Sequence, residues 1–291
     1  MGVRAQAPGG GGSSASAYAP AMSAFICTAC GTQYPPSEVP PGACPICTDE
    51  RQFVPASGQS WTTLEGLRKA HSNKFRRLAP GLTTIETTPG FGIGQRAMFV
   101  SAPGGNVLWD CITLVDDATV DLLKGLGGVS AIAISHPHYY TTMAEWSRAL
   151  GDVAIHLHAA DRQWVMRPDP AVQFWEGETK LIAPGLTLAR LGGHFDGGTV
   201  LHWADWQEGR GLLLSGDILQ VVPSGHVSFM WSYPNLIPLS AAKVRRMAEI
   251  LEPFAFDAVY GAFSGRGQID AKGKEAVAAS VARYIRRVSE D

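Results

Sequence analysis

Short apolar runs separated by polar, glycine-rich turns occupy most of the chain after residue 81. β-Branched and aromatic residues dominate these runs, which is typical of strands that are buried in a sheet. The runs predict strands over residues 82–87, 97–100, 106–110, 130–134, 153–158, 186–191, 199–203, 211–214 and 256–260. Pro103-Gly104-Gly105 reads as a hairpin turn between the second and third of them.

Apolar residues spaced three and four apart predict helices between these strands. The expected helices cover residues 61–78, 118–126, 141–150, 159–164, 240–251 and 270–288, and residues 220–238 read as a long aromatic loop. Strands that alternate with helices predict an α/β (α+β) fold in which two sheets carry helices on their outer faces.

The first 22 residues consist largely of Gly, Ala, Ser and Pro. Such a segment buries too little apolar surface to offset the entropy of ordering, so we predict disorder over residues 1–23. The segment lacks the apolar core of a secretory signal, and Met22 is an alternative start. The expected organisation is this segment, a small module over 24–57, a linking helix over 58–79 and a main domain over 80–291.

Charge and hydropathy exclude two classes of partner. The formal net charge is -2 and the Lys and Arg residues are scattered, which argues against nucleic-acid binding. No apolar run reaches the roughly 20 residues that a membrane-spanning helix needs. The expected partner is a small-molecule substrate, while the oligomeric state stays open.

Four of the five cysteines form two CxxC pairs, Cys27 with Cys30 and Cys44 with Cys47. Four thiolates on two such turns can surround one ion at Zn–S distances of about 2.3 Å. The stretch over 24–55 resembles a zinc ribbon, and more closely the knuckles of a rubredoxin. A structural zinc is expected, iron is the alternative metal, and disulfides would need strained or crossed pairing. Cysteines that bind metal instead of forming disulfides, in a sequence with no secretory signal, indicate a cytoplasmic protein.

Three further motifs place metal-competent side chains directly after apolar strands. The first ends the run 132–134 with His136 and His138, and alternate residues of an extended strand end point the same way. The second places His194 in a glycine-rich turn after 186–191, and the third places Asp217 after 211–214. The pattern predicts that the four side chains meet at one metal.

Together with NVLWD (106–110), the motifs SHPH (135–138), GHFDGG (193–198) and LSGD (214–217) resemble the metallo-β-lactamase superfamily in order and spacing. The resemblance covers roughly residues 80–290. It implies an αββα sandwich with a metal site at the strand ends between the sheets. In the family, His136, His138 and His194 belong to one metal position and Asp217 bridges to a second, while Asp110 helps to orient a ligand histidine.

The chain departs from the family at the second metal position. The family pattern HxHxDH continues here with Tyr140 and Thr141, and no histidine occurs over 260–264. The missing ligands are those exclusive to the second position. We therefore predict one active-site metal, held by His136, His138, His194 and Asp217.

These residue types suit hydrolysis. Zinc accepts histidine and aspartate ligands, and a catalytic site keeps one position for water, whose pKa the ion lowers from near 16 to about 7. The predicted function is a mononuclear zinc-dependent hydrolase that attacks an ester, thioester or amide through a metal-bound hydroxide. Asp217 serves as ligand or as general base. Tyr140, or its neighbour Tyr139, hydrogen-bonds an oxyanion or else packs as an ordinary aromatic residue.

Loops beyond strand ends commonly carry specificity. His226, Trp231 and Tyr233 lie in the aromatic loop after Asp217, and Arg266 lies in a glycine-rich turn near the C-terminus. We expect these four residues to contact the substrate, with Arg266 facing an anionic group unless it is simply exposed.

Two other functions remain open on the sequence. His136, His194 and Asp217 also make the facial triad of a mononuclear iron oxygenase, which would resemble the persulfide dioxygenase branch of the superfamily. In that case His138 is a bystander, and redox-active iron in the cysteine module, passing electrons, would favour this alternative. Alternatively, the reduced ligand set marks a scaffold that no longer catalyses. Zinc, iron or no metal in the histidine site separates the three.

Overall fold

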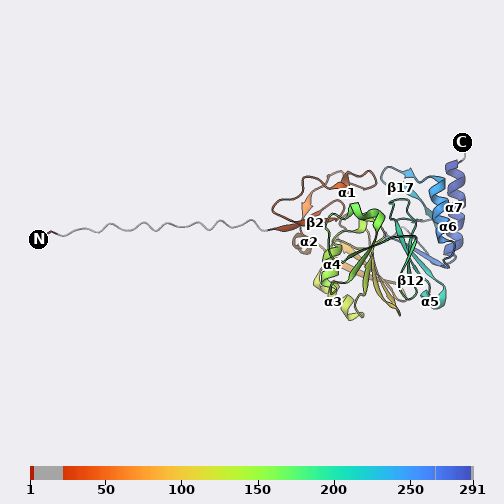
Figure 1. Cartoon of the computed structure of the whole chain (residues 1–291), viewed down its shortest axis with the longest axis horizontal. Helices are drawn as coiled ribbons and strands as arrows, with labels where there is room; N and C mark the ends of the chain where they lie inside the picture. The colour runs from red at the N-terminus through yellow and green to blue at the C-terminus, as the bar shows by residue number, and fades with distance from the viewer. Residues whose placement is uncertain (3–21, 266, 290–291) are drawn as a thin grey trace.

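The computed structural model describes residues 1–2, 22–265 and 267–289 (Figure 1). The predicted disorder over residues 1–23 therefore falls mostly outside the described residues. At the end of that range, Ser23 already belongs to strand β1 (Ser23–Cys27).

Two large sheets pack against each other and form the body of the protein (Figure 1). The first has the order β10-β9-β8-β7-β6-β5-β4, and the second has the order β11-β12-β13-β14-β19-β20. The strands of the first sheet are β4 (Ser72–Ala79), β5 (Leu82–Thr88), β6 (Ala97–Ala102), β7 (Gly105–Trp109), β8 (Ala131–Ala133), β9 (Ala154–His158) and β10 (Val172–Trp175). The strands of the second are β11 (Thr179–Ala183), β12 (Leu186–Arg190), β13 (Thr199–Trp203), β14 (Leu212–Gly216), β19 (Ala258–Gly261) and β20 (Gln268–Ile269).

Side chains of the central strands are buried on both faces of each sheet. In β6, Met98 and Val100 pack in the layer between the sheets, while Ala97 and Phe99 pack on the opposite face. Successive strand residues point to opposite faces, so a strand covered on both sides is apolar throughout. This explains why the strands read as continuous apolar runs in the sequence.

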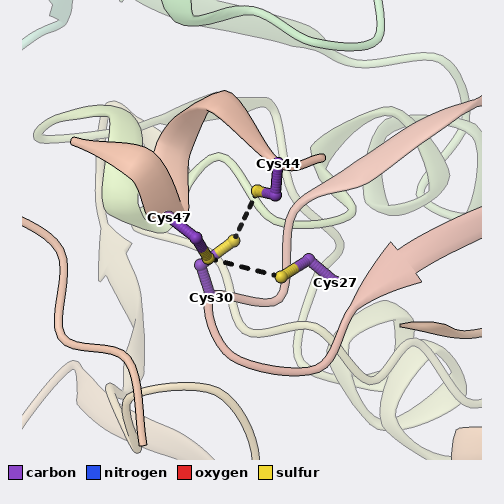
Figure 2. A group of neighbouring side chains, drawn as sticks. All are labelled: Cys27, Cys30, Cys44 and Cys47. Carbon is purple, nitrogen blue, oxygen red and sulfur yellow. Dashed lines mark hydrogen bonds between the residues drawn. The ribbon is translucent and has the colours of Figure 1, made fainter. Parts of the chain in front are cut away.

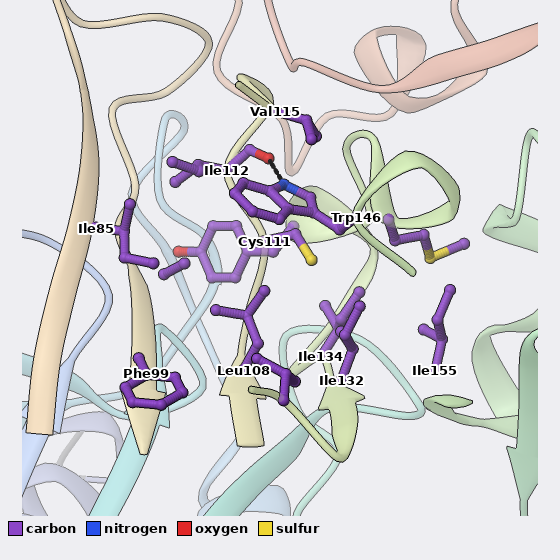
Figure 3. Packing of buried hydrophobic residues seen from close by; sticks show 14 of the residues in the cluster. Ile85, Phe99, Leu108, Cys111, Ile112, Val115, Ile132, Ile134, Trp146 and Ile155 are labelled. Atoms are coloured by element: carbon purple, nitrogen blue, oxygen red, sulfur yellow. Dashed lines mark hydrogen bonds between the residues drawn. The ribbon is translucent and has the colours of Figure 1, made fainter. Parts of the chain in front are cut away.

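Helices cover the outer face of each sheet, as predicted. Helices α3 (Asp117–Gly125) and α4 (Met143–Ala149) lie on the first sheet, and α6 (Ala241–Leu251) and α7 (Gly273–Ser289) lie on the second (Figure 1). The side chain of Trp146 in α4 is completely buried, and its Nε1 donates a hydrogen bond to the carbonyl oxygen of Ile112 at 2.8 Å (Figure 3). The αββα sandwich expected from the sequence is confirmed.

The N-terminal module forms a small sheet of its own, in the order β2-β1-β3. Its elements are β1, β2 (Gln33–Ser37), the single-turn helix α1 (Pro45–Thr48) and β3 (Trp61–Thr62). Helix α2 (Leu64–Ala70) follows, and Thr63 caps it by accepting a hydrogen bond from the Gly66 amide.

The prediction of a linking helix was wrong beyond Ala70. Residues 72–79 form β4, which pairs antiparallel with β5 along the edge of the first sheet. The cross-strand pair of Phe75 with Ile85 adds Phe75 to the sheet's core, and this packing outweighs the helical spacing of the apolar residues. The main sheet therefore begins at residue 72.

Two smaller differences concern residues 220–238, predicted as a loop, and residues 159–164, predicted as a helix. Residues 220–238 contain two hairpins, made by β15 (Gln220–Val222) with β16 (His226–Ser228) and by β17 (Met230–Ser232) with β18 (Ile237–Pro238). Residues 159–164 form a 3₁₀ helix, η2 (Ala159–Trp164), and α5 (Trp206–Gly209) is a kinked turn.

Among the described residues, no helix combines the length and the apolar content that crossing a bilayer requires.

Candidate metal centre

Three histidines and one aspartate meet where strands of the two sheets end. His136 and His138 follow β8, His194 follows β12 and Asp217 follows β14. All four side chains are buried, and one ligand atom of each lies within 4.8 Å of the others. The structure thus brings together the four side chains that the sequence motifs single out.

The pair His136 and His138 is presented by a turn and not by an extended strand end, so this part of the prediction was wrong. Strand β8 ends at Ala133, and Pro137–Tyr139 form the 3₁₀ turn η1. Proline fixes its own backbone at the first position of that turn. The two imidazole rings still lie 5.0 Å apart because the turn folds them over the same point.

The donor atoms are spaced as one tetrahedral ion requires. His136 Nε2 lies 3.1 Å from Asp217 Oδ1, and His138 Nδ1 lies 3.4 Å from His194 Nε2. Zinc–nitrogen bonds of about 2.0–2.1 Å place two tetrahedral donors about 3.3–3.4 Å apart. His136 Nε2 and Asp217 Oδ1 are both buried, and neither has a polar partner other than the atom facing it within this group. Buried polar atoms are normally satisfied, so the residues fit a bound cation.

Burial sets the protonation states of the group. It lowers the pKa of His136 and His138 well below the ordinary histidine value, and it lowers the pKa of His194 to about 4. Burial also raises the pKa of Asp217 to about 7. Near neutral pH the imidazoles are therefore uncharged, which is the form that binds a metal.

Hydrogen bonds fix the orientation of two of the imidazole rings. His194 Nδ1 donates to the Trp231 carbonyl oxygen at 2.7 Å, which leaves Nε2 as the ligand atom. His136 Nδ1 lies 2.9 Å from Ser135 Oγ, and the Ser135 amide donates to Asp110 Oδ1 at 2.7 Å. Asp110, expected to help orient a histidine, thus reaches His136 through Ser135.

We predict that Ser135→Ala lowers the metal affinity of the centre about 10- to 100-fold, the usual cost of removing a partner that orients a ligand. Competition with a chelator measures this affinity. Ser215→Ala is the matched control, since its hydroxyl bonds the Leu219 carbonyl oxygen at 2.8 Å and contacts no ligand histidine. Equal affinities of the Ser135→Ala and wild-type proteins would show that Ser135 does not orient His136.

A cavity of about 500 Å³ opens onto this group. His138 and Asp217 form part of its wall. The other lining residues are Arg51, Gln52, Phe53, Ile93, Gln220, Tyr233, Pro234, Leu236 and Phe263. A small molecule can therefore reach the donor atoms.

The residues expected to contact substrate are distributed unevenly. Tyr233 lines the cavity, and its hydroxyl donates to the Asp217 carbonyl oxygen at 2.5 Å. Trp231 lies beside the group through its contact with His194. His226 does not line the cavity, and its Nδ1 contacts Ser224 instead. Arg266 lies outside the described residues.

The structure does not place Tyr140 on the cavity. Its side chain packs in the core beneath α4, so the alternative of ordinary aromatic packing describes it. Tyr139 is the neighbour of the metal ligands: its ring lies 4.4 Å from that of His136, and its buried hydroxyl lies beside the Asp217 carboxylate. Tyr139 and not Tyr140 lies beside the ligands because the backbone departs from strand geometry at Pro137. A 3₁₀ turn directs successive side chains differently from a strand.

Arg51, Gln52 and Phe53 were not expected in the cavity wall. They belong to the N-terminal module and lie four to six residues after Cys47, the last cysteine of the second CxxC pair. No local sequence pattern marks them as cavity residues, because they reach the cavity only when the N-terminal module packs against the main domain. Ser135, by contrast, could have been found from its position directly before the first ligand histidine.

The four cysteines of the module form a second group (Figure 2). Cys27 and Cys47 have their sulfurs 3.4 Å apart, and those of Cys30 and Cys44 lie 3.6 Å apart. Sulfurs around one tetrahedral zinc are about 3.8 Å apart when each Zn–S bond is about 2.3 Å. All four are free cysteines, and the Tyr34 hydroxyl donates to Cys44 Sγ at 3.1 Å. The arrangement is compatible with a zinc ribbon.

Comparison with known proteins identifies a relative whose sequence aligns with almost the whole chain. The uncharacterized protein YmaE of Bacillus subtilis (strain 168) is 46% identical over 273 residues, which are 93% of this chain and 98% of YmaE. The chain belongs to the YmaE family. No family model matches the sequence.

This member of the YmaE family shares its fold with metallo-β-lactamases of known structure. The DIM-1 metallo-β-lactamase aligns with a TM-score of 0.52 at 12% identity, over 72% of this chain and 98% of DIM-1. FIM-1 from Pseudomonas aeruginosa, in its mono-zinc form, aligns with a TM-score of 0.53 at 12% identity, over 72% of this chain and 95% of FIM-1. The predicted metallo-β-lactamase fold of the YmaE-family chain is thereby confirmed.

Proposed function

We propose that the protein is a mononuclear zinc-dependent hydrolase that cleaves an ester, thioester or amide of a small molecule. One observation carries the proposal: four buried donors converge at a cavity of about 500 Å³, and two of their facing atoms have no hydrogen-bond partner outside the group. Within the described residues, the two groups able to hold a metal are this one and the cysteine cluster. A single active-site ion agrees with that ligand set.

His136, His138, His194 and Asp217 would hold the ion. Bound zinc supplies a coordinated water whose pKa is about 7 instead of near 16, and it polarises a carbonyl group. Asp217 has two carboxylate oxygens, so one can hold the ion while the other accepts a proton. Tyr139 replaces Tyr140 as the tyrosine beside the ligands, where its hydroxyl, next to the Asp217 carboxylate, can donate to a developing oxyanion.

The cavity wall indicates the class of substrate. Its apolar part is formed by Phe53, Ile93, Pro234, Leu236 and Phe263, while its polar part includes His138 and Asp217. A substrate that fits carries its cleavable carbonyl near the metal ligands and an apolar group against this apolar part of the wall. Tyr233 is the aromatic-loop residue best placed to contact it.

The position of His138 favours zinc hydrolysis over iron oxygenation. A facial triad needs only three protein donors. His138 is not a bystander, because its Nδ1 lies 3.4 Å from His194 Nε2 and its ring packs against both other imidazoles. We also propose a structural zinc in the cysteine cluster and a cytoplasmic location, since four unpaired neighbouring thiols suit a reducing compartment.

A panel of esters, thioesters and amides with short and long apolar acyl groups tests the proposal. We expect turnover that a chelator abolishes and that zinc alone restores, with preference for the apolar substrates. Oxygen consumption by an iron-loaded protein would instead support the oxygenase. A zinc-loaded protein that hydrolyses no member of the panel would contradict the proposal and favour a scaffold.

A further inference from the structure

The segment that follows the second CxxC pair lies against a metal ligand of the main domain. The side chain of Arg51 is only 13% exposed. Its Nη1 donates a hydrogen bond to the His194 carbonyl oxygen at 3.0 Å. The N-terminal module therefore contacts the backbone of one of the four residues of the histidine centre.

Arg51 is held rigidly in that position. Asp49 accepts hydrogen bonds from Arg51 Nε at 2.7 Å and from Arg51 Nη2 at 2.8 Å. The guanidinium group is therefore bound by both carboxylate oxygens. The guanidinium carbon also lies 3.9 Å from the centre of the Phe195 ring, with Trp164 and Trp231 at 5.3 and 5.7 Å. A buried cation enclosed by aromatic rings and a carboxylate has little freedom to move.

The other side of the segment is bound to β17 and to the loop that follows it. The Glu50 carbonyl oxygen accepts hydrogen bonds from Ser232 Oγ at 2.6 Å and from Asn235 Nδ2 at 2.7 Å. The same region holds the His194 ring through Trp231. Figure 1 shows α1 and β17 along the same edge of the molecule, where these contacts form. Two segments, residues 49–51 and residues 231–235, thus hold His194 and are hydrogen-bonded to each other.

We propose that Arg51 is a positioning residue for His194, and that through it the cysteine module forms part of the histidine centre. The proposal rests on the proposed function only in requiring that this centre binds a metal. Cys47 lies two residues before Asp49, so an ion in the cysteine cluster anchors the start of the segment. The module also contributes Gln52 and Phe53 to the cavity wall, which gives it a role beyond its own folding.

The test measures cobalt binding by wild type and Arg51→Met. Cobalt in the histidine centre absorbs through d–d transitions, while cobalt in the cysteine cluster adds thiolate charge-transfer bands, so the two sites are followed separately. We expect Arg51→Met to bind cobalt in the histidine centre about 10- to 100-fold more weakly, with the cysteine bands unchanged. Arg51→Lys, which keeps the charge but not the paired contacts, should fall between.

Arg68→Met is the matched control, since Arg68 also bonds a backbone carbonyl, that of Val115 at 2.8 Å, but contacts no metal ligand. It should bind cobalt like wild type. Equal affinity of Arg51→Met and wild type would overturn the positioning role, and so would a loss of both sites together, which indicates general unfolding. A wild-type protein that binds cobalt in the histidine centre yet hydrolyses nothing refutes the proposed function alone. Absence of cobalt from that centre in wild type overturns both.

Discussion

We expect His194→Ala to lose the ion proposed for the histidine centre, so that the metal content falls from the two ions per chain that the two ligand groups could hold to one. His194 supplies one of four buried donors, and its Nε2 lies 3.4 Å from His138 Nδ1. Losing a partner that merely orients a ligand costs about 10- to 100-fold in affinity, so losing the ligand itself should cost more than about 100-fold. Hydrolysis should fall to background, because the zinc-bound water is lost with the ion.

Metal analysis of the purified proteins measures this loss directly. The remaining ion should stay with the cysteines, which lie in a separate group. His226→Ala is the control: this histidine contacts Ser224 and does not line the cavity, so both ions should remain. Retention of two ions by His194→Ala would show that His194 is not a ligand.

We expect Cys44→Ser to lose the ion proposed for the cysteine cluster and to unfold the N-terminal module. The serine hydroxyl does not replace the thiolate that zinc prefers. The buried core of the module consists of its cysteines with Ala29, Tyr34 and Ile46, which is too little to stabilise it alone. Binding of a structural zinc contributes about 10–16 kcal/mol in such small modules, so its loss should leave the module unfolded.

Limited proteolysis combined with metal analysis tests this expectation. Cleavage should begin within residues 24–57, while the main domain resists. Cys111→Ala is the control, because Cys111 is buried in the core of the main domain and belongs to neither metal group. A Cys44→Ser protein that keeps both ions and resists the protease would contradict a structural metal in this cluster.

Much of the fold could be predicted because its strands are covered on both faces. Residues such as Phe99 and Val100 are buried on opposite sides of β6, so the strand reads as an uninterrupted apolar run. The error over 72–79 has a physical cause. β4 is an edge strand whose alternate residues are exposed, and its pairing with β5 cannot be inferred from its own sequence.

The candidate ligands could be identified because each follows a buried strand, where the two sheets present their ends together. The exchange of Tyr140 for Tyr139 could not be foreseen, because it depends on the turn at Pro137. Arg51 was missed for a different reason. It contacts His194 across 143 residues of chain, and that contact exists only once the module has docked.

Anomalous diffraction at the zinc edge, from crystals of the zinc-loaded protein, tests the central claim most directly. The account predicts one peak enclosed by His136, His138, His194 and Asp217, at about 2.0–2.2 Å from the four donors, in addition to the peak among the cysteines. A peak at the cysteines alone would contradict it.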